Sequence, residues 1–285
     1  MCSSDLRSLL QTHAEADRKN FQSTYSFSGG FITIRGDIHS QKIATIARDA
    51  PRGSTVLTLT EHPTIKVGSR VRVVMGANKE LGREIHGGED AGSQTFDEIK
   101  QFFSQIAMVT ALEDNRITLD QAMRLPIKPE WGAEVWSFEP TVEDVGIEGL
   151  SFEFPGTPKR EHLREEGFNA IFFRGVSNCW VSDVQTIDCD NAVNLLQSSF
   201  CTIRQVICRT VKRQTPSGHH ALWVRGTQDC LFTDFDIRTR FVHDLSVEGI
   251  AIGTVFMNGR GESLNFDHHR NAPYENLFTN LDAGD

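Results

Sequence analysis

The chain has no hydrophobic run long enough to cross a membrane and no excess of basic residues. A membrane helix needs about 20 consecutive apolar residues, and none of the 285 residues begins such a run. The opening stretch SDLRSLLQTHAEADRKN is polar and charged, so we expect no signal peptide. The net charge of -9 argues against nucleic acid, because phosphate binding depends on clustered positive charge. The sequence therefore predicts neither membrane insertion nor a nucleic-acid partner.

Closely spaced cysteine pairs are also absent. The six cysteines include no C-x-x-C pair, which a structural zinc site would need. Three of them, Cys179, Cys201 and Cys230, share one inward position of a repeat. We expect reduced thiols buried at that position, with a disulfide between neighbouring coils as the alternative if the geometry suits one.

The sequence does contain one short pattern that repeats five times between residues 168 and 285. Its anchors lie 22, 29, 21 and 25 residues apart, at Cys179, Cys201, Cys230, Ala251 and Asn276. Two residues after the anchors the column reads Val181, Ile203, Phe232, Gly253 and Phe278. Eight residues before them it reads Ile171, Val193, Leu222, His243 and His268. Polar stretches at 212–218 and 258–263 fill the longer gaps, so insertions fall between strands.

A repeat of this length, made of short β-branched and aromatic runs without a helical period, indicates a β-solenoid. Each turn buries its apolar edge by stacking on its neighbours. The segment VEDVGIEGLSFEF adds Val145, Ile147 and Leu150 to the same columns. With these six partial coils, residues 142–285 resemble the right-handed parallel β-helix of the pectate-lyase-like superfamily.

The remaining half of the chain divides into two further parts. We expect a capping helix within residues 1–28, where Leu6, Leu9 and Leu10 recur at helical spacing. Residues 29–141 predict an irregular β-subdomain whose strands include FITIRG, STVLTLTE and SRVRVVMG. The Gly- and Glu-rich stretch 77–94 predicts an exposed loop inserted in it. The whole is an all-β protein, and we expect the coils of 142–285 to be a fragment of a longer solenoid.

The candidate site lies between residues 219 and 274, where five of the ten histidines gather. Seven residues before the anchors, an outward column would hold Trp223, Asp244 and His269 in a ladder about 10 Å long. An aromatic ring, a carboxylate and an imidazole in that order suit a sugar. We therefore predict four substrate-binding residues, namely Trp223, Asp244, Arg225 and His220.

The run NFDHHRN at 265–271 is the most chemically dense stretch. Asp267 and His269 share one face by alternation, whereas His268 and Arg270 share the other, which the column alignment turns inward. A buried guanidinium is costly unless it is paired, so either the register slips by one residue here or these groups line a polar site; mutual pairing at a coil end is a third reading. The sequence predicts no cofactor, but His243, His268 and Asp267 leave room for a divalent cation.

The superfamily resemblance implies an enzyme acting on a polysaccharide, and its uronic-acid members cleave by β-elimination. That reaction needs a base and positive charge beside the substrate carboxylate. Arg270 or Arg225 would supply the charge, and His269 or Tyr274 would move the proton. The predicted catalytic residues are His269, Arg270, Tyr274 and Asp267.

Two alternatives stand beside the lyase. A glycoside hydrolase would use a carboxylate pair, for which Asp244 and Asp267 are the neat candidates; the third reading is a non-catalytic carbohydrate-binding or tailspike-like protein. The NTD, DD and RIK signatures of the polygalacturonase branch are absent, as are the clustered acidic calcium ligands of typical pectate lyases. The resemblance also implies a polysaccharide partner and an extracellular or periplasmic location, and leaves the oligomeric state open.

Overall fold

The computed structural model describes residues 27–89, 101–158, 163–213, 217–271 and 273–285. The described chain forms two compact units: one of residues 27–36, 142–269 and 275–285, the other of residues 37–141 and 270–274. The predicted capping helix falls on residues 1–26, outside the described ones. No helix in the described ranges is long and apolar enough to cross a membrane.

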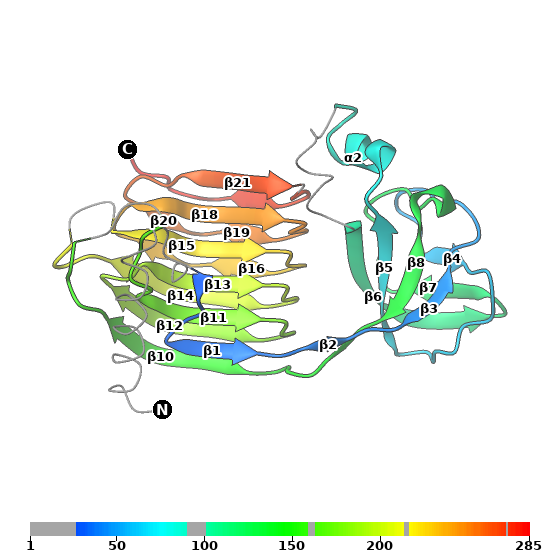
Figure 1. Ribbon diagram of the computed structural model, residues 1–285, viewed down its shortest axis with the longest axis horizontal. Helices are drawn as coiled ribbons and strands as arrows, with labels where there is room; N and C mark the ends of the chain where they lie inside the picture. The colour runs from blue at the N-terminus through cyan, green and yellow to red at the C-terminus, as the bar shows by residue number, and fades with distance from the viewer. Residues whose placement is uncertain (1–26, 90–100, 159–162, 214–216, 272) are drawn as a thin grey trace. The chain divides into compact units, whose positions relative to one another are not determined.

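The first unit is a right-handed parallel β-helix, as the repeat predicted (Figure 1). The chain passes in turn between two parallel sheets, and each round trip adds one strand to each sheet. The first sheet has the order β1 (Ile32–Arg35), β11 (Asn169–Arg174), β13 (Asn191–Leu196), β15 (Gly218–Arg225), β18 (Phe241–Gly249) and β21 (Phe266–Asn271). The second has β10 (Gly146–Glu153), β12 (Trp180–Ile187), β14 (Thr202–Arg209), β16 (Leu231–Thr233), β19 (Val255–Met257) and β22 (Leu277–Thr279), with β17 (Asp236–Ile237) and β20 (Arg260–Gly261) at its side.

The register corrects the predicted columns in the last two coils. On β21, Phe266 lies beside Leu245, in the place that the sequence columns gave to His268. Leu245 pairs with Leu222, in the place that the sequence columns gave to His243. In the second sheet Phe256 pairs with Phe232, in the place given to Gly253. Backbone bonds from each anchor carbonyl to the next coil make the fourth anchor Thr254, not Ala251, so the anchor gaps become 22, 29, 24 and 22 residues.

The inner faces of both sheets form one apolar core. Phe232 and Phe256 stack with ring centroids 4.6 Å apart, and Phe256 and Phe278 with centroids 5.0 Å apart. Of the predicted core residues Leu150 is an exception, since it is 41% exposed. It pairs with the buried Val184 but lies on β10, the edge strand of the second sheet, so no further coil of the described residues packs over it.

Each coil bends at the same two places through left-handed backbone. The first column of positive-φ residues precedes the anchors, at Asn178, Phe200, Asp229, Gly253 and Glu275. The second lies five residues later, at Asp183, Gln205, Asp234, Asn258 and Asn280. Asn, Asp and Gly tolerate this conformation best, and Asn280 also donates from Nδ2 to Oδ1 of Asn258 at 2.7 Å. Because these bends recur at equivalent positions, they preserve the register between successive coils.

The cysteines of the described chain are free and buried, as predicted. Cys179, Cys201 and Cys230 occupy the inward anchor column and are each 1% exposed. Burial raises the pKa of the Cys189 thiol to about 12. Thiols in such surroundings are poor nucleophiles, so they act as small apolar core groups.

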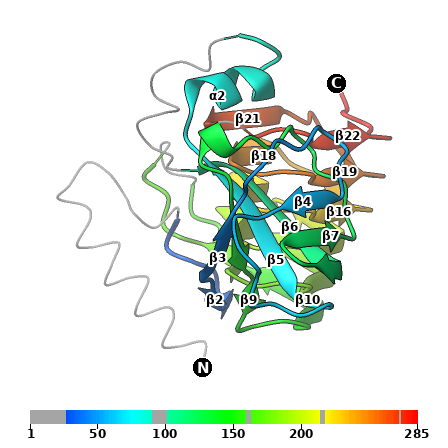
Figure 2. The same cartoon turned by 90° about the vertical axis from the view of Figure 1, so that its right-hand side faces the viewer.

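The second unit is a small antiparallel barrel (Figure 2). Its sheet has the order β3 (Lys42–Thr45), β8 (Glu134–Ser137), β5 (Arg70–Gly76), β6 (Gln101–Glu113), β7 (Arg116–Leu119) and β4 (Val56–Thr58). A bridge between Ile46 and Leu59 joins the ends of β3 and β4 and closes the ring. Closure removes unpaired edges, which is a usual solution for small β domains.

The boundaries of the barrel differ from the sequence prediction in two ways. Strand β1, expected in the β-subdomain of residues 29–141, lies in the solenoid, where it pairs in parallel with β11. Within the predicted loop 77–94, residues Lys79–Ile85 form helix α2, capped by Asn78, whose Oδ1 accepts the N–H of Glu80 at 2.8 Å. The short 3-10 helix η2 (Pro129–Trp131) and the two-residue strands β2 (Ile38–His39) and β9 (Glu139–Pro140) complete the unit.

Candidate functional site

Two columns of outward side chains cross the first sheet of the solenoid. In one column Phe172, Asn194, Trp223 and Ser246 are successive register partners. The other holds Asn169, Asn191, His220 and His243. The predicted ladder of Trp223, Asp244 and His269 is therefore incorrect, because Ser246 takes the place beside Trp223.

Asp267 continues the first column onto β21 and collects three polar partners. Ser246 donates from Oγ to its Oδ2 at 2.8 Å. Nδ1 of His243 lies 3.1 Å from the same oxygen, and Nδ1 of His269 lies 3.6 Å from it. The side chains are partly open to solvent, at 17% for His243, 19% for Asp267 and 39% for His269. These four residues are called the Asp267 cluster below.

The histidine rings continue from the Asp267 cluster back to β15. The His220 ring stacks on His243 with centroids 5.0 Å apart, and on His219 with centroids 4.3 Å apart. His219 is buried with Nδ1 3.2 Å from the carboxylate of Glu165, while Nδ1 of His220 lies 3.3 Å from Oδ1 of Asn191. The outer face of this sheet therefore carries a continuous row of imidazoles.

Two of the predicted substrate-binding residues lie on this face but are covered. Trp223 is 2% exposed and His220 is 4% exposed. The Phe27 ring lies 6.0 Å from the ring of Trp223 and 6.2 Å from that of His220. Neither ring presents an open plane to solvent, so the sugar-stacking role expected of Trp223 has no free surface in this structure.

Sequence reasoning missed Glu248, which lies at the end of the same face. Trp223 donates from Nε1 to its Oε2 at 3.1 Å, and Arg225 lies 3.7 Å from its Oε1. The backbone bond from Leu245 to Asn265 continues the register onto β21 and puts His269 beside Glu248. Arg225, Glu248 and His269 thus occupy three successive rungs, and the Arg225 side chain is 49% exposed.

Asp244 proves to be a structural carboxylate. It is 1% exposed and accepts hydrogen bonds from the N–H of Phe241, the N–H of Asn265 and the Asn265 side chain. Burial raises its pKa to about 6, although the backbone hydrogen bonds oppose that rise. Its role here is to tie β18 to the segment before β21.

The predicted catalytic residues separate into two groups. The structure brings Asp267 and His269 together, but Arg270 follows on the opposite side of β21, where it is exposed. Tyr274 is 9% exposed, and residues 270–274 group with the barrel unit. His268, on the same side as Arg270, is exposed with its ring centroid 5.7 Å from Phe278. β21 is the edge strand of its sheet. Its inward-pointing side chains therefore stay exposed, because no further coil of the described residues packs over them.

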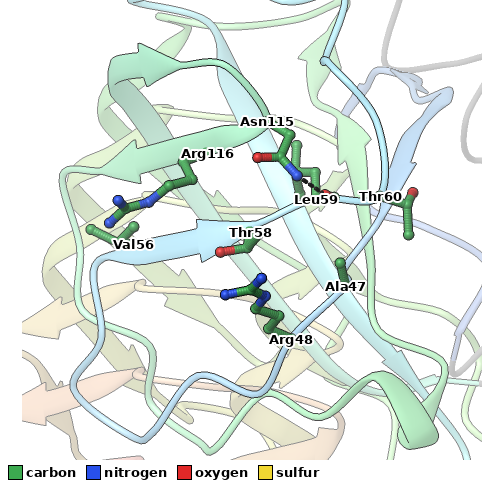
Figure 3. A pocket seen from close by; sticks show the side chains of 8 residues that line it. All are labelled: Ala47, Arg48, Val56, Thr58, Leu59, Thr60, Asn115 and Arg116. Atoms are coloured by element: carbon green, nitrogen blue, oxygen red, sulfur yellow. Dashed lines mark hydrogen bonds between the residues drawn. The ribbon is translucent and has the colours of Figure 1, made fainter.

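A pocket of about 820 Å³ opens in the barrel, within a single unit (Figure 3). It is lined by Ala47, Arg48, Val56, Thr58, Leu59, Thr60, Asn115 and Arg116. Asn115 is bonded through Nδ2 to the carbonyl of Leu59 at 2.7 Å. Its lining residues include two cations, Arg48 and Arg116, and no carboxylate or imidazole.

No family model matches the chain, and no curated protein matches it in sequence. Among solved structures it is similar to the tailspike gp61 of Pseudomonas phage phi297, with a TM-score of 0.53 and 10% identity over 85% of this chain and 42% of that one. It also matches the gp54 tailspike of Acinetobacter baumannii bacteriophage AP22, solved with A. baumannii capsular saccharide, with a TM-score of 0.40 and 6% identity over 82% of this chain and 38% of that one. A third match is the tailspike gp49 of Pseudomonas phage LKA1, with a TM-score of 0.35 and 8% identity over 85% of this chain and 47% of that one.

The likeness to gp61 supports the β-helix fold and nothing finer. The chain spans less than half the length of each of these three tailspikes, at 42%, 38% and 47%. What the whole of any of those proteins does is therefore a separate question from what this chain does.

Proposed function

We propose that this chain is a carbohydrate-active β-helix protein that binds an acidic polysaccharide and cleaves it by β-elimination. The observation that carries the proposal is the solvent-accessible imidazole of His269, which lies beside a carboxylate, Asp267, and two rungs from a partly exposed arginine, Arg225. Two rungs of a parallel sheet span about 10 Å, which is the scale of a sugar ring with its substituents.

The chemistry follows from these three side chains. A neutral His269 removes the proton next to the uronate carboxylate, and Asp267 orients the imidazole and stabilises it once it is charged. Arg225 neutralises the substrate carboxylate and so favours the enolate-like intermediate. The electron pair of the broken C–H bond then forms the double bond as the glycosidic oxygen leaves. Arg225 is preferred to Arg270 because it shares the outer face with His269.

A glycoside hydrolase is the second candidate, on one specific observation. Glu248 and Asp267 are diagonal neighbours on the outer face, about 8 Å apart between Cα atoms from the strand rise and the rung spacing. This placement puts two carboxylates on neighbouring strands of one face, and a glycosidase needs such a pair. It replaces the pair of Asp244 and Asp267 expected from sequence, because Asp244 is buried.

The test is to incubate the protein with a panel of acidic and neutral glycans. β-Elimination leaves unsaturated uronate ends that absorb in the ultraviolet, so we expect new absorbance and new reducing ends together. Reducing ends without absorbance would favour the hydrolase. Retention of a glycan on an affinity column without cleavage would favour a binding protein, and no interaction with any glycan would contradict the proposal. An extracellular or periplasmic place of action remains a prediction.

A further inference from the structure

We propose that His243, Asp267 and His269 form a binding site for one divalent transition-metal ion of the zinc class. Each residue offers one ligand atom, and these atoms all lie within 4.8 Å of one another. An ion bound here occupies the lone pair of the His269 imidazole, so His269 acts as a base in the proposed elimination only in the ion-free protein; the binding test itself needs no glycan.

The donor set selects the class of ion. Two imidazoles and one carboxylate are ligands that zinc and its first-row neighbours accept readily. Calcium and magnesium prefer sites made of oxygen atoms alone. Three protein ligands leave a fourth position for water or another ligand, which is how accessible zinc sites differ from closed structural ones.

The surroundings already orient the ligands. Ser246 is fully buried and donates from Oγ to Oδ2 of Asp267 at 2.8 Å, which fixes the carboxylate. His243 is on β18, and the other two ligands are on β21, so all three come from neighbouring strands of one sheet. Outer partners that hold a ligand in place commonly raise metal affinity 10- to 100-fold. Exposure of 17%, 19% and 39% gives an ion access from solvent.

A second histidine group, His219, His220 and His243, also brings its ligand atoms within 4.8 Å. It fits an ion less well. The rings of His219 and His220 stack at 9° with centroids 4.3 Å apart, so their in-plane lone pairs run parallel instead of converging. Both residues are nearly buried, at 2% and 4% exposure. The carboxylate of Glu165 lies 3.2 Å from Nδ1 of His219 and so competes with an ion for that nitrogen.

The experiment uses the full chain without an affinity tag, freed of metal with a chelator. Titration calorimetry with Zn²⁺ and the visible spectrum with Co²⁺ then report stoichiometry, affinity and coordination. We expect one ion per chain with a Kd in the micromolar range or tighter. Asp267→Asn and His269→Ala should each weaken the Kd at least tenfold, which corresponds to about 1.4 kcal/mol.

His268→Ala is the matched control, because His268 is the neighbour of two ligands but lies on the other side of the same strand. It should leave the Kd unchanged. Circular dichroism and thermal unfolding of each metal-free variant check the fold, which a near-isosteric Asp267→Asn change is expected to preserve. Absence of binding, an equal loss in His268→Ala, or unchanged affinity in both Asp267→Asn and His269→Ala would overturn the proposal. Loss confined to His219→Ala and His220→Ala would likewise overturn it, since the ion would then belong to the other histidine group.

Discussion

The same two outward columns carry different chemistry at the two ends of the first sheet. On β11 and β13 they hold Asn169 and Asn191, bonded to each other at 2.7 Å, together with Phe172 and Asn194. On β15, β18 and β21 the corresponding positions lead to His220, His243 and Asp267. The backbone register is continuous from one end of the sheet to the other. The two ends therefore differ in the side chains that they carry at equivalent positions.

The largest effect is expected for His269→Ala, which removes an ionisable side chain from the late coils. If the proposed lyase activity is present, removing the base should lower turnover by about 10²- to 10⁴-fold, while an outward, 39% exposed side chain contributes little to stability. Initial rates on a cleaved glycan and thermal unfolding should be measured together. His268→Ala serves as the control; equal rates in both variants would remove the imidazole from the mechanism.

The late coils should have a tightly packed inner face, and Phe235→Ala tests this. Phe235 is 3% exposed in the apolar core. Its truncation should lower the free energy of unfolding by about 3 to 5 kcal/mol, as measured by denaturant titration. Leu150→Ala, at a position 41% exposed, should change it by about 0.5 kcal/mol or less. A cost for Phe235→Ala within that smaller range would mean that the late coils have no tightly packed core.

Asp244 lies on β18, among the coils that carry ionisable side chains, but its role is structural. Its pKa is raised to about 6, so ionisation costs folded-state free energy. The resulting stability is present below about pH 4, the usual pKa of an aspartate, and is lost as the pH rises through 6; the loss is at most about 3 kcal/mol. Unfolding free energies measured from pH 4 to 7 should show this decline in the unmodified protein and lack it in Asp244→Asn. Parallel curves would show that Asp244 is not the group responsible.

A moderate loss of stability is expected for Gly259→Ala in the late coils. A Cβ at residue 259 would lie 2.2 Å from the ring of Phe235, which is buried and has little room to move. We expect a loss of about 1 to 3 kcal/mol. Leu150→Ala, at a position 41% exposed, is the control. A thermal shift no larger than that of the control would contradict the tight packing of residue 259.

The sequence predicted the β-helix because its strongest columns contain residues that the structure buries. Val181, Ile203 and Phe232 form the second-sheet column as expected. The next coil was misplaced because Ala251 is also small and buried, so apolar character alone fits more than one alignment. A better signal was available: Gly253 completes the column of left-handed residues before the anchors, and it selects Thr254.

The candidate site was predictable in part, for reasons of the same kind. Asp267 and His269 follow from strict alternation within one strand. Glu248 could not be singled out, because a carboxylate at a strand end is usually a solvated surface group and its contact with Trp223 depends on register between coils. The closure of the barrel was equally hidden, since the bridge of Ile46 to Leu59 joins segments whose strands lie at opposite ends of the sheet order.

The chain enters and leaves the barrel through two adjacent segments. Strands β2 and β9 run side by side, Thr141 donates its N–H to the carbonyl of Asp37 at 2.8 Å, and Asp37 donates its own to Oγ1 of Thr141 at 2.8 Å. Because the two ends of this module meet, we expect that a tight turn could replace it without displacing the flanking strands β1 and β10. Exchange of one such module for another would then leave the side chains on the outer face of the coils unchanged.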